Sequence, residues 1–249
     1  MRSAEARQTR ETMPRIWKEE WKTYKDVFDQ FSERNLYKLI LNKTIDGLDS
    51  PLSIGKEANL FTARKGEEVV VVKMYRLSTC DFNRMYEYLS ADPRSLGVKR
   101  SHRQIIFAWA KREFRNLLLA REAGVSVPTP FVILFNILVM ECVFSKNIVA
   151  QKLHEDTPKY PQLFFEELMS EMKKMHNAGL VHGDLSPFNI LNADQHPVLI
   201  DWSQATTLEN QNARDFLKRD VKNVCTYFRK LGVKCEEEKV LNEIISSHL

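Results

Sequence analysis

Glycine and proline are scarce in this sequence, which contains 8 and 9 of them among 249 residues. So few of them leave little room for low-complexity linkers and exclude a collagen-like chain. Apolar residues make up 43% and charged residues 28%, a balance that also excludes wholesale disorder. The composition is that of an ordinary globular protein, long enough for one large domain or two small lobes.

Long hydrophobic runs are also missing. The longest one, 131–144, is interrupted by Asn136 and Glu141. Even an unbroken run of that length would be shorter than a membrane-spanning helix, which needs about 20 residues. No apolar segment follows the charged residues 1–10, so the sequence does not predict a secretory signal. We expect a cytoplasmic protein without membrane partners.

The cysteines are few and are not arranged for metal or disulfide chemistry. The sequence has four of them, Cys80, Cys142, Cys225 and Cys235, and no Cys-x-x-Cys pair. This spacing argues against a structural zinc site and against a disulfide framework. We expect a reducing intracellular compartment, with Cys142 in the core because it lies within an apolar run.

Positive charge is concentrated in one segment. The chain carries a net charge of +4, yet 92–121 alone carries +6, so the remainder carries −2. Two acidic residues, Asp92 and Glu113, stand in this segment against eight basic ones: Arg94, Lys99, Arg100, Arg103, Lys111, Arg112, Arg115 and Arg121. Such a run is either a solvated helix face or a surface for phosphate or nucleic acid.

Strands dominate the first half of the chain. The hydrophobic pattern predicts a helix over 15–41 and then strands over 52–63, with a tight turn, and over 68–75. An irregular polar stretch, 76–100, precedes a long helix with Ser101 as N-cap, Gln104 completing a capping box and Gly124 as its left-handed stop. Two further strands are expected over 131–135 and 137–143.

Helices dominate the second half. A helix beginning at Pro161 and ending before Gly179 precedes short strands within 180–191 and over 198–200, and two helices follow, near 212–231 and 236–246. We therefore predict an α+β fold of two lobes with a cleft between them. The expected divisions are a helical extension over 1–50, a strand-rich lobe over 51–143 and a short helical lobe over 144–249.

The clearest chemical pattern is His-Gly-Asp-Leu-Ser-Pro-Phe-Asn over 182–189. Asp184 and Asn189 stand five residues apart on a predicted loop, and Asp201 follows the predicted strand 198–200. Amide and carboxylate oxygens are the ligands that Mg²⁺ prefers, and nucleotide phosphates complete such sites. Asn189 and Asp201 are therefore candidate metal ligands, which leaves Asp184 to orient or deprotonate an attacking hydroxyl.

Two earlier features fit the same chemistry. Lys73 lies at the end of the strand 68–75, where a buried lysine needs a partner, and Glu113 on the long helix can provide it. Together they would hold the α- and β-phosphates of a nucleotide. The turn with Ser53, Gly55 and Lys56 can present backbone N–H groups to phosphate.

The order of these features is that of a protein-kinase-like fold, and the motifs are closer to one family. The runs 53–59, 71–76, 112–117 and 122–128 resemble the RIO family of atypical serine/threonine protein kinases, and most of all its first branch. The resemblance extends from about residue 35 to 233. It implies a two-lobed kinase fold and a phosphotransferase that uses ATP with Mg²⁺, or Mn²⁺ in its place.

The resemblance also implies roles for single residues. Lys73 would hold the phosphates with Glu113 as partner, Asp184 would be the catalytic aspartate, and Asn189 and Asp201 would bind the metal. Asp201 would in addition accept phosphate as an acyl-phosphate.

Two segments gain a role in the same way. The hinge 140–143 would contact adenine through the backbone of Glu141 and Val143. The segment 76–100 would be a flexible loop that carries an autophosphorylated serine, with Ser78, Ser90 and Ser95 as candidates.

The sequence departs from ordinary protein kinases in ways that affect the substrate. Asp201-Trp202-Ser203 replaces the usual Asp-Phe-Gly, and Gly183 replaces the usual arginine before the catalytic aspartate. Only residues 202–249 follow Asp201, which leaves little room for an activation segment or a peptide-docking subdomain, so slow ATP hydrolysis or self-phosphorylation is expected. His182-Gly183-Asp184 also resembles small-molecule kinases of the aminoglycoside-phosphotransferase type, an alternative that stays open.

The family is tied to maturation of the small ribosomal subunit, so the resemblance implies ribosomal precursors and their RNA as partners. A nucleotide-gated assembly factor without a substrate of its own is a further alternative. Within the basic segment we expect contacts to ribosomal RNA phosphate from Arg94, Lys99, Arg100 and Arg103. Lys111, Arg112 and Arg115 are less suited to this role, because they flank Glu113.

Overall fold

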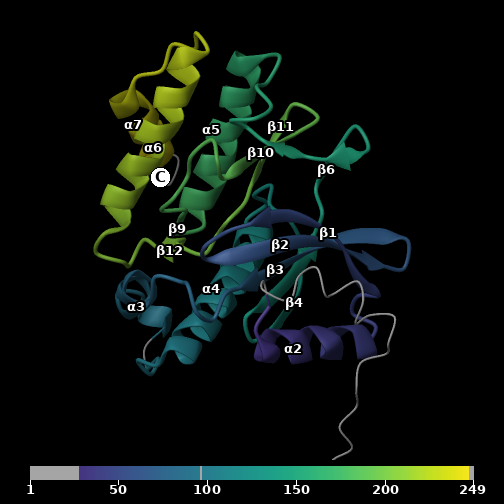
Figure 1. Ribbon diagram of the computed structural model, residues 1–249. Coiled ribbons are helices and arrows are strands. Elements are labelled where there is room, and N and C mark those ends of the chain that lie inside the picture. Colours follow the sequence, from purple (N-terminus) through teal and green to yellow (C-terminus); the bar gives the residue numbers. More distant parts are fainter. Residues whose placement is uncertain (1–27, 96, 247–249) are drawn as a thin grey trace, which may run out of the picture.

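The computed structural model describes residues 28–95 and 97–246, which form a strand-rich lobe and a mainly helical lobe (Figure 1). The first lobe is built on a five-stranded antiparallel sheet with the strand order β1-β2-β3-β5-β4. Its strands are β1 (Gly47–Ile54), β2 (Ala58–Lys65), β3 (Glu68–Tyr75), β4 (Pro130–Leu134) and β5 (Ile137–Glu141). The α+β expectation of two lobes is confirmed.

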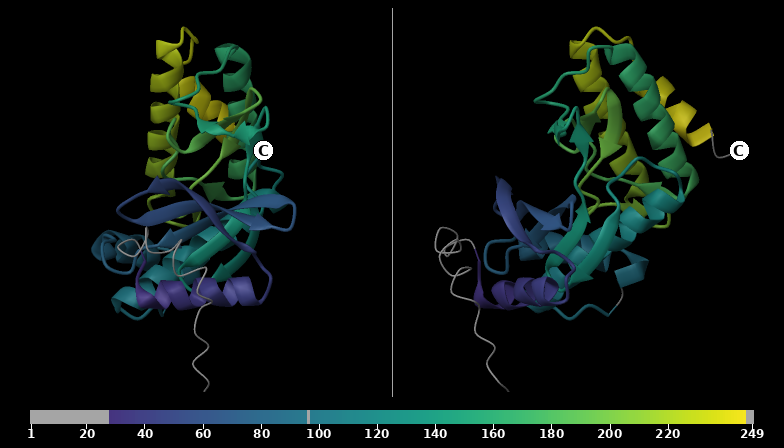
Figure 2. Two further views of the ribbon diagram at one scale, coloured as in Figure 1. Left: turned by 45° about the vertical axis from the view of Figure 1, so that its right-hand side comes forward. Right: turned by 90° about the vertical axis from the view of Figure 1, so that its right-hand side faces the viewer.

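Helices cover both faces of this sheet, α2 (Gln30–Leu41) on one and α4 (His102–Glu122) on the other (Figures 1 and 2). Successive side chains of a strand point to opposite faces. On β3, Val70 and Val72 accordingly pack with α2, whereas Val71 and Tyr75 pack on the side of α4. Lys73 shares the face of Val71 and Tyr75, so the alternation of β3 directs it toward α4.

The helix predicted over 15–41 begins later within the described residues. α2 starts at Gln30 because the carboxylate of Asp29 accepts hydrogen bonds from the N–H groups of Phe31 and Ser32, each at 3.0 Å. Such an N-cap fixes the first turn of a helix. The predicted part before residue 28 lies outside the described residues. β1 begins at Gly47, so the sheet starts before the boundary expected at residue 50.

The segment 76–100, expected to be irregular, contains helix α3 (Phe82–Ser90) and a short 3₁₀ helix, η2 (Pro93–Ser95). Asp81 caps α3 by accepting the N–H of Arg84 at 3.1 Å. Met85 and Leu89 are buried, and together with Phe82 they show the i, i+3, i+7 spacing of a helix with one apolar face. The expectation failed because these few apolar residues stand among many polar ones.

Long helices make up most of the second lobe, and within the described residues its short strands form three small sheets of three, two and two strands. α5 (Pro161–Asn177) begins at the predicted proline, and α6 (Ala213–Lys230) and α7 (Glu237–Ser246) follow the predicted boundaries closely. The short strands are β6 (Phe144–Ser145), β7 (Ile148–Val149), β8 (Gln151–Lys152), β9 (Leu180–Val181), β10 (Ile190–Ala193), β11 (His196–Leu199) and β12 (Thr206–Thr207).

The ends of α4 confirm one prediction and correct another. Gly124 follows the helix with φ of +72°, the left-handed conformation expected of a glycine stop. Ser101 occupies the N-cap position, but its side chain accepts no capping hydrogen bond, so the predicted capping box with Gln104 is wrong.

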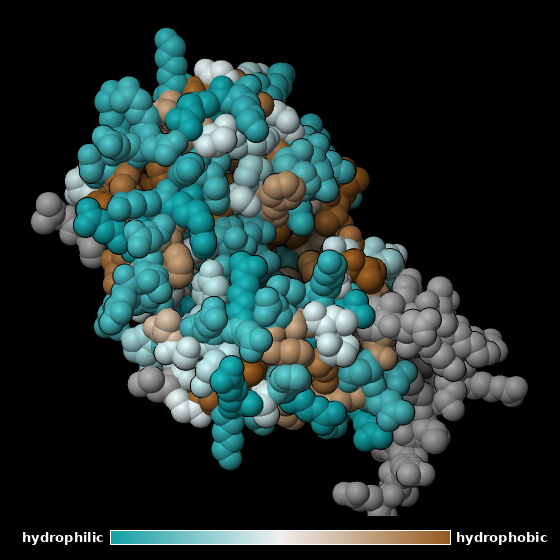
Figure 3. All heavy atoms as spheres, turned by 60° about the vertical axis from the view of Figure 1, so that its left-hand side comes forward, coloured by the Kyte–Doolittle hydropathy of each residue, from teal (hydrophilic) through white to brown (hydrophobic). Residues whose placement is uncertain are grey.

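The surface and the cysteines match the composition. On the face shown in Figure 3 hydrophilic side chains predominate on both lobes, and hydrophobic ones form small patches between them. All four cysteines are buried and free. Within residues 28–95 and 97–246, no helix is long and apolar enough to cross a membrane.

Candidate functional site

Lys73 is the centre of the site. It is buried on β3, and its Nζ lies 2.7 Å from Oε1 of Glu113 on α4 and 3.1 Å from Oδ1 of Asp201 after β11. Burial by itself would lower the pKa of Lys73, but the charges of Asp201 and Glu113 outweigh it and raise that pKa above its ordinary value. The predicted pairing of Lys73 with Glu113 is present, and Asp201 joins it.

Tyr75 completes this cluster and was not predicted. Its hydroxyl donates a hydrogen bond to Oε2 of Glu113, whose other carboxylate oxygen bonds Lys73. Burial raises the pKa of Glu113 in spite of the nearby lysine charge. The hydroxyl keeps the second oxygen of this buried carboxylate satisfied, which limits the cost of its desolvation. The signal in the sequence was the position of Tyr75, two residues after Lys73 and thus on the same face of β3.

The loop between β9 and β10 carries Asp184 and Asn189, as predicted. Asn189 Nδ2 donates to the backbone oxygen of Asp184 at 2.8 Å and to its carboxylate Oδ2 at 3.2 Å. Burial and then the charge of Asp201 raise the pKa of Asp184. A carboxylate with a raised pKa binds a proton more strongly, which suits a residue that orients or accepts the proton of a hydroxyl.

Asp201 and Asn189 lie at matching ends of a strand pair. β10 and β11 are antiparallel with Ile190 opposite Leu199, and the N–H of Ile200 donates to the backbone oxygen of Asn189 at 3.0 Å. Asp201 has φ of +61°, and its Oδ1 accepts the hydroxyl of Ser203 at 2.9 Å. Burial would raise the pKa of Asp201, but the charge of Lys73 outweighs it and lowers that pKa.

These two residues fit a magnesium ion. The amide nitrogen of Asn189 is engaged with Asp184, which turns its donor side away and leaves its oxygen as the ligand atom. One amide oxygen and one carboxylate are hard ligands suited to Mg²⁺. No group of three or more His, Cys, Asp or Glu residues with metal-site geometry exists in the described parts of the chain. Nucleotide phosphates and water would therefore supply the remaining ligands.

The predicted phosphate turn and hinge flank the lysine. Across the sheet, Ser53 on β1 pairs with Leu60, which pairs with Lys73, so these residues stand in one row. The N–H of Gly55 donates to the oxygen of Ala58 at 3.1 Å, and an added Cβ would lie 2.9 Å from that oxygen. Gly55 thus closes the hairpin with its own N–H, so a phosphate contact from this turn would use its other N–H groups.

The other residues predicted to contact the nucleotide are Lys56 in the turn and Glu141 and Val143 in the hinge. Lys56 is exposed in the turn. In the predicted hinge Glu141 ends β5. Its backbone N–H donates to the carbonyl of Thr129 at 2.8 Å, and its carboxylate accepts the backbone N–H of Thr129 at 2.9 Å. The carbonyl of Val143 accepts the N–H of Ala150 at 2.9 Å. The backbone of this hinge is therefore held from both sides.

Asp220 on α6 holds the catalytic loop and was missed. Its two carboxylate oxygens accept the N–H groups of Gly183 at 2.7 Å and Leu185 at 2.8 Å, on either side of Asp184. It is fully buried, and burial raises its pKa to about 7. The signal was an aspartate on the apolar face of α6, next to the buried Val221.

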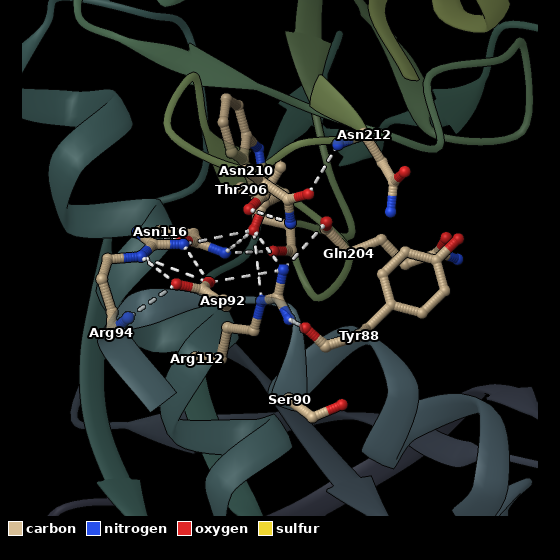
Figure 4. A network of polar contacts seen from close by, with 12 residues as sticks. Tyr88, Ser90, Asp92, Arg94, Arg112, Asn116, Gln204, Thr206, Asn210 and Asn212 are labelled. Carbon is tan, nitrogen blue, oxygen red and sulfur yellow. Dashed lines mark hydrogen bonds and ion pairs between the residues drawn. The ribbon is translucent and has the colours of Figure 1, made fainter. Parts of the chain in front are cut away.

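A polar network joins the first lobe to the backbone that follows Asp201 (Figure 4). The carbonyl of Ala205 accepts hydrogen bonds from Arg112 Nε at 3.2 Å and from Asn116 Nδ2 at 2.8 Å. Asn116 also donates to the carbonyl of Trp202 at 2.8 Å. These contacts fix the segment after the candidate metal ligand relative to α4.

Asp92 anchors the two arginines of this network. Its carboxylate accepts Arg94 Nη2 at 2.7 Å and lies 3.5 Å from Arg112 Nη2, while Arg94 Nη1 donates to Asn116. Burial would raise the pKa of Asp92, but the hydrogen bonds of Arg94 and the charge of Arg112 lower it. The guanidinium of Arg94, one of the residues expected to contact RNA phosphate, is thus already bonded within the protein.

His182 is a buried support of the loop. Its Nε2 lies 3.0 Å from the carbonyl of Ile200, and its ring packs 5.0 Å from that of Trp202. Burial lowers the pKa of His182 to about 4, so the ring is neutral in the folded protein near neutral pH. An unfolded histidine titrates near 6.5.

This difference predicts an acid-sensitive contribution to stability. Between about pH 6.5 and pH 4 the unfolded chain binds a proton at His182 that the folded chain refuses, so stability falls as the pH falls. From about pH 7.5 to pH 5, wild type should lose about 2 kcal/mol more than the His182→Gln variant. Urea unfolding at both pH values measures this loss. His196→Gln, at an exposed histidine, is the control, and an equal loss in wild type and His182→Gln would contradict the prediction.

Comparison with known proteins agrees with this geometry. The family model of the RIO domain matches residues 59–241. Two relatives named RIO-type serine/threonine-protein kinase Rio1 align over most of the chain. The one from Haloferax volcanii is 40% identical over 223 residues, covering 89% of this chain and 77% of the relative. The one from Methanocaldococcus jannaschii is 38% identical over 232 residues, covering 93% and 80%.

A solved structure shares the fold. The Rio2 kinase–ADP/Mg²⁺–phosphoaspartate complex from Chaetomium thermophilum superimposes with a TM-score of 0.64 at 20% identity, over 84% of this chain and 64% of that chain. The predicted two-lobed kinase-like fold is thereby confirmed. With a family model matching residues 59–241 and relatives of up to 40% identity, the chain belongs to the RIO family of atypical serine/threonine-protein kinases.

Proposed function

We propose that this RIO kinase binds ATP and Mg²⁺ in the cleft between its lobes and transfers the terminal phosphoryl group to serine, to its own Asp201 or to water. The observation that carries the proposal is the position of Lys73, which bonds Glu113 from α4 and Asp201 from the second lobe at once. One cation thus joins the candidate phosphate site of one lobe to the candidate metal site of the other. The protein-kinase names of its relatives support a protein acceptor over the small molecule of the alternative reading.

Each residue has a distinct task in this scheme. Lys73 would bind the α- and β-phosphates, and Glu113, itself held by Tyr75, would keep the ammonium group in place. Asn189 and Asp201 would bind Mg²⁺, which neutralises phosphate charge when present. Most of the catalytic effect in such reactions comes from positioning and electrostatics, which rigid supports provide.

Asp184 would act on the attacking group. It lies on the same loop as Asn189, and its backbone is held by Asp220 through the flanking N–H groups. Its raised pKa favours capture of the hydroxyl proton. This placement gives Asp184 a role in the chemical step, separate from the binding of the metal.

The surroundings of the site favour self-phosphorylation and ATP hydrolysis over a bound peptide. α3 is held to α4 by Arg112 Nη1, which donates to the carbonyl of Tyr88 at 2.7 Å, and it touches the second lobe where the Tyr88 ring stacks on that of Phe216 at 5.6 Å. Residues 202–212 alone connect Asp201 to α6, which is too short for an extended docking segment. Ser78 and Ser90 near α3 are exposed, whereas Ser95 is half-buried.

We further propose that the protein acts in the cytoplasm on precursors of the small ribosomal subunit and contacts their RNA. The basic segment 92–121 supports an RNA partner through its charge. A nucleotide-gated assembly factor differs from a kinase in one respect. It turns over ATP only when the ribosomal precursor particle is bound.

One test of this proposal concerns Asp184. The Asp184→Ala variant should lose about 10²- to 10⁴-fold in phosphoryl transfer, because an acid–base group acting on the nucleophile contributes that much. ATP affinity should stay nearly unchanged, since the residue does not hold the phosphates. Single-turnover transfer from γ-labelled ATP and nucleotide titration measure the two effects. Asp215→Ala, at an exposed aspartate of α6, is the matched control. Near-normal transfer in Asp184→Ala would refute the assignment.

The second prediction concerns Asp201. If its carboxylate accepts the γ-phosphoryl group, the bond from the γ-phosphorus to the bridging oxygen breaks, ADP leaves, and an acyl-phosphate forms. Wild-type protein incubated with γ-labelled ATP should then carry label that hydroxylamine removes, unlike the label on phosphoserine. The Ser78→Ala/Ser90→Ala variant should keep this labile fraction. Label that is wholly stable to hydroxylamine would leave serine as the only acceptor.

The third prediction separates the kinase from the gated factor. ATP turnover measured with and without small-subunit precursors should show a basal rate with the protein alone and a higher rate with the particles. Asp184→Ala should abolish both rates. A basal rate of zero with full turnover on particles would favour the gated factor. No change on adding particles would refute the ribosomal partner.

A further inference from the structure

A cavity of about 510 Å³ lies between α4 and residues 92–95 and 97–99. Arg112 and Asn116 line its side toward the segment that follows Asp201, and the rest of its α4 lining comes from the face of the helix that points away from Glu113. Lys111 and Arg115 line it, and each stands two residues from Glu113, which places them roughly 200° around the helix from that side chain. The helix therefore presents Glu113 to the nucleotide site and a second set of side chains to this cavity.

The lining is strongly positive. It contains one carboxylate, Asp92, and five cationic side chains: Arg94, Lys99, Lys111, Arg112 and Arg115. Asp92 is already bonded to Arg94 and faces Arg112. Within the described residues, no carboxylate pairs with Lys99, Lys111 or Arg115. Three cations thus surround one hollow without a counter-charge from the protein.

Repulsion among these cations lowers the stability of the folded protein unless an anionic ligand compensates their charge. Lys111 and Arg115 stand four residues apart on one exposed helix face. Two like charges at this spacing destabilise a helix by about 0.2 to 0.5 kcal/mol. Uncharged donors, among them Gln104 and Ser95, line the same hollow. Lysine serves as a point charge and arginine as a two-pronged donor to phosphate oxygens. The cavity also has the size of ordinary small-ligand sites, about 300 to 1,000 Å³.

We propose that this cavity binds an anion with several phosphate groups, either a free polyphosphate chain or consecutive phosphates of an RNA strand. Lys99, Lys111 and Arg115 make the direct contacts, and Arg94 forms a wall that Asp92 holds in place. Several phosphates are needed because three separate cations face the hollow. The sequence favoured Arg94 over Lys111 and Arg115 for this role, and the structure reverses that order since Arg94 is bonded internally.

The test compares two double variants of the full chain. Lys111→Gln/Arg115→Gln removes two charges from the cavity, and Lys218→Gln/Lys222→Gln removes two exposed charges, also four residues apart, from α6. The probes are inorganic tripolyphosphate, followed by calorimetry, and a fluorescent single-stranded RNA of mixed sequence, followed by anisotropy. A saturating non-hydrolysable ATP analogue with Mg²⁺ keeps the nucleotide site filled throughout. Thermal melting checks that both variants fold as wild type does.

The cavity variant should bind each ligand at least about tenfold more weakly than wild type, and the α6 variant should bind nearly as wild type does. For RNA, the slope of log affinity against log salt should flatten by about 0.7 for each phosphate that the variant no longer neutralises. Gln104→Glu replaces an amide in the cavity by a carboxylate of nearly the same shape. It should weaken anion binding although every cation remains. Loss of tripolyphosphate binding alone would identify a free polyphosphate as the ligand, and loss of both would include RNA.

Two results would overturn the proposal. Equal weakening in the two double variants would mean that general positive charge, and not the cavity, attracts the anion. Failure of wild type to bind either probe would mean that the three cations are only a solvated surface. Neither result bears on the catalytic residues, because the nucleotide site stays occupied and ATP turnover is measured separately.

Discussion

A buried lysine that bonds two carboxylates from distant parts of the chain is the constraint around which this protein is arranged. Lys73 lies on the central strand β3, and its partners Glu113 and Asp201 are 40 and 128 residues away in sequence. A lone buried ammonium group would be costly, so β3, α4 and the end of β11 must stay together for the charge to be compensated. Tyr75 supports the cluster from the same face of the strand.

The reactive residues are held mainly by backbone groups bonded to buried side chains. Asp220 fixes both amides that flank Asp184, and Asn116 with Arg112 fixes the carbonyls after Asp201. Buried polar groups of this kind are effective only when each has its partner, because an unpaired one costs the free energy of a missing hydrogen bond. The loop of Asp184 and the segment after the candidate metal ligand Asp201 therefore take their positions from α6 and α4.

Much of this architecture could be predicted from local pattern. The β-branched run of β3, the proline that begins α5 and the glycine that ends α4 are strong local signals, and they were placed well. α3 was missed because its apolar residues are few, and the capping box of Ser101 failed because residue type and spacing allow such a side-chain contact without ensuring that it forms. The pattern of the turn at Gly55 likewise could not indicate that the N–H of this residue is used within the hairpin.

The sequence by itself determined the chemistry of the site, because the residue types and spacing of Lys73, Asp184, Asn189 and Asp201 identify the candidate phosphate, nucleophile and metal positions. Only the tertiary structure decided which charges are available to a ligand. Arg94 and Lys111 line the same cavity, yet the first is bonded to Asp92 and Asn116 and the second has no carboxylate partner within the described residues. The physical reason is that a charged side chain already paired within the protein is less available to a ligand. The groups that pair with it come from elements distant in the sequence.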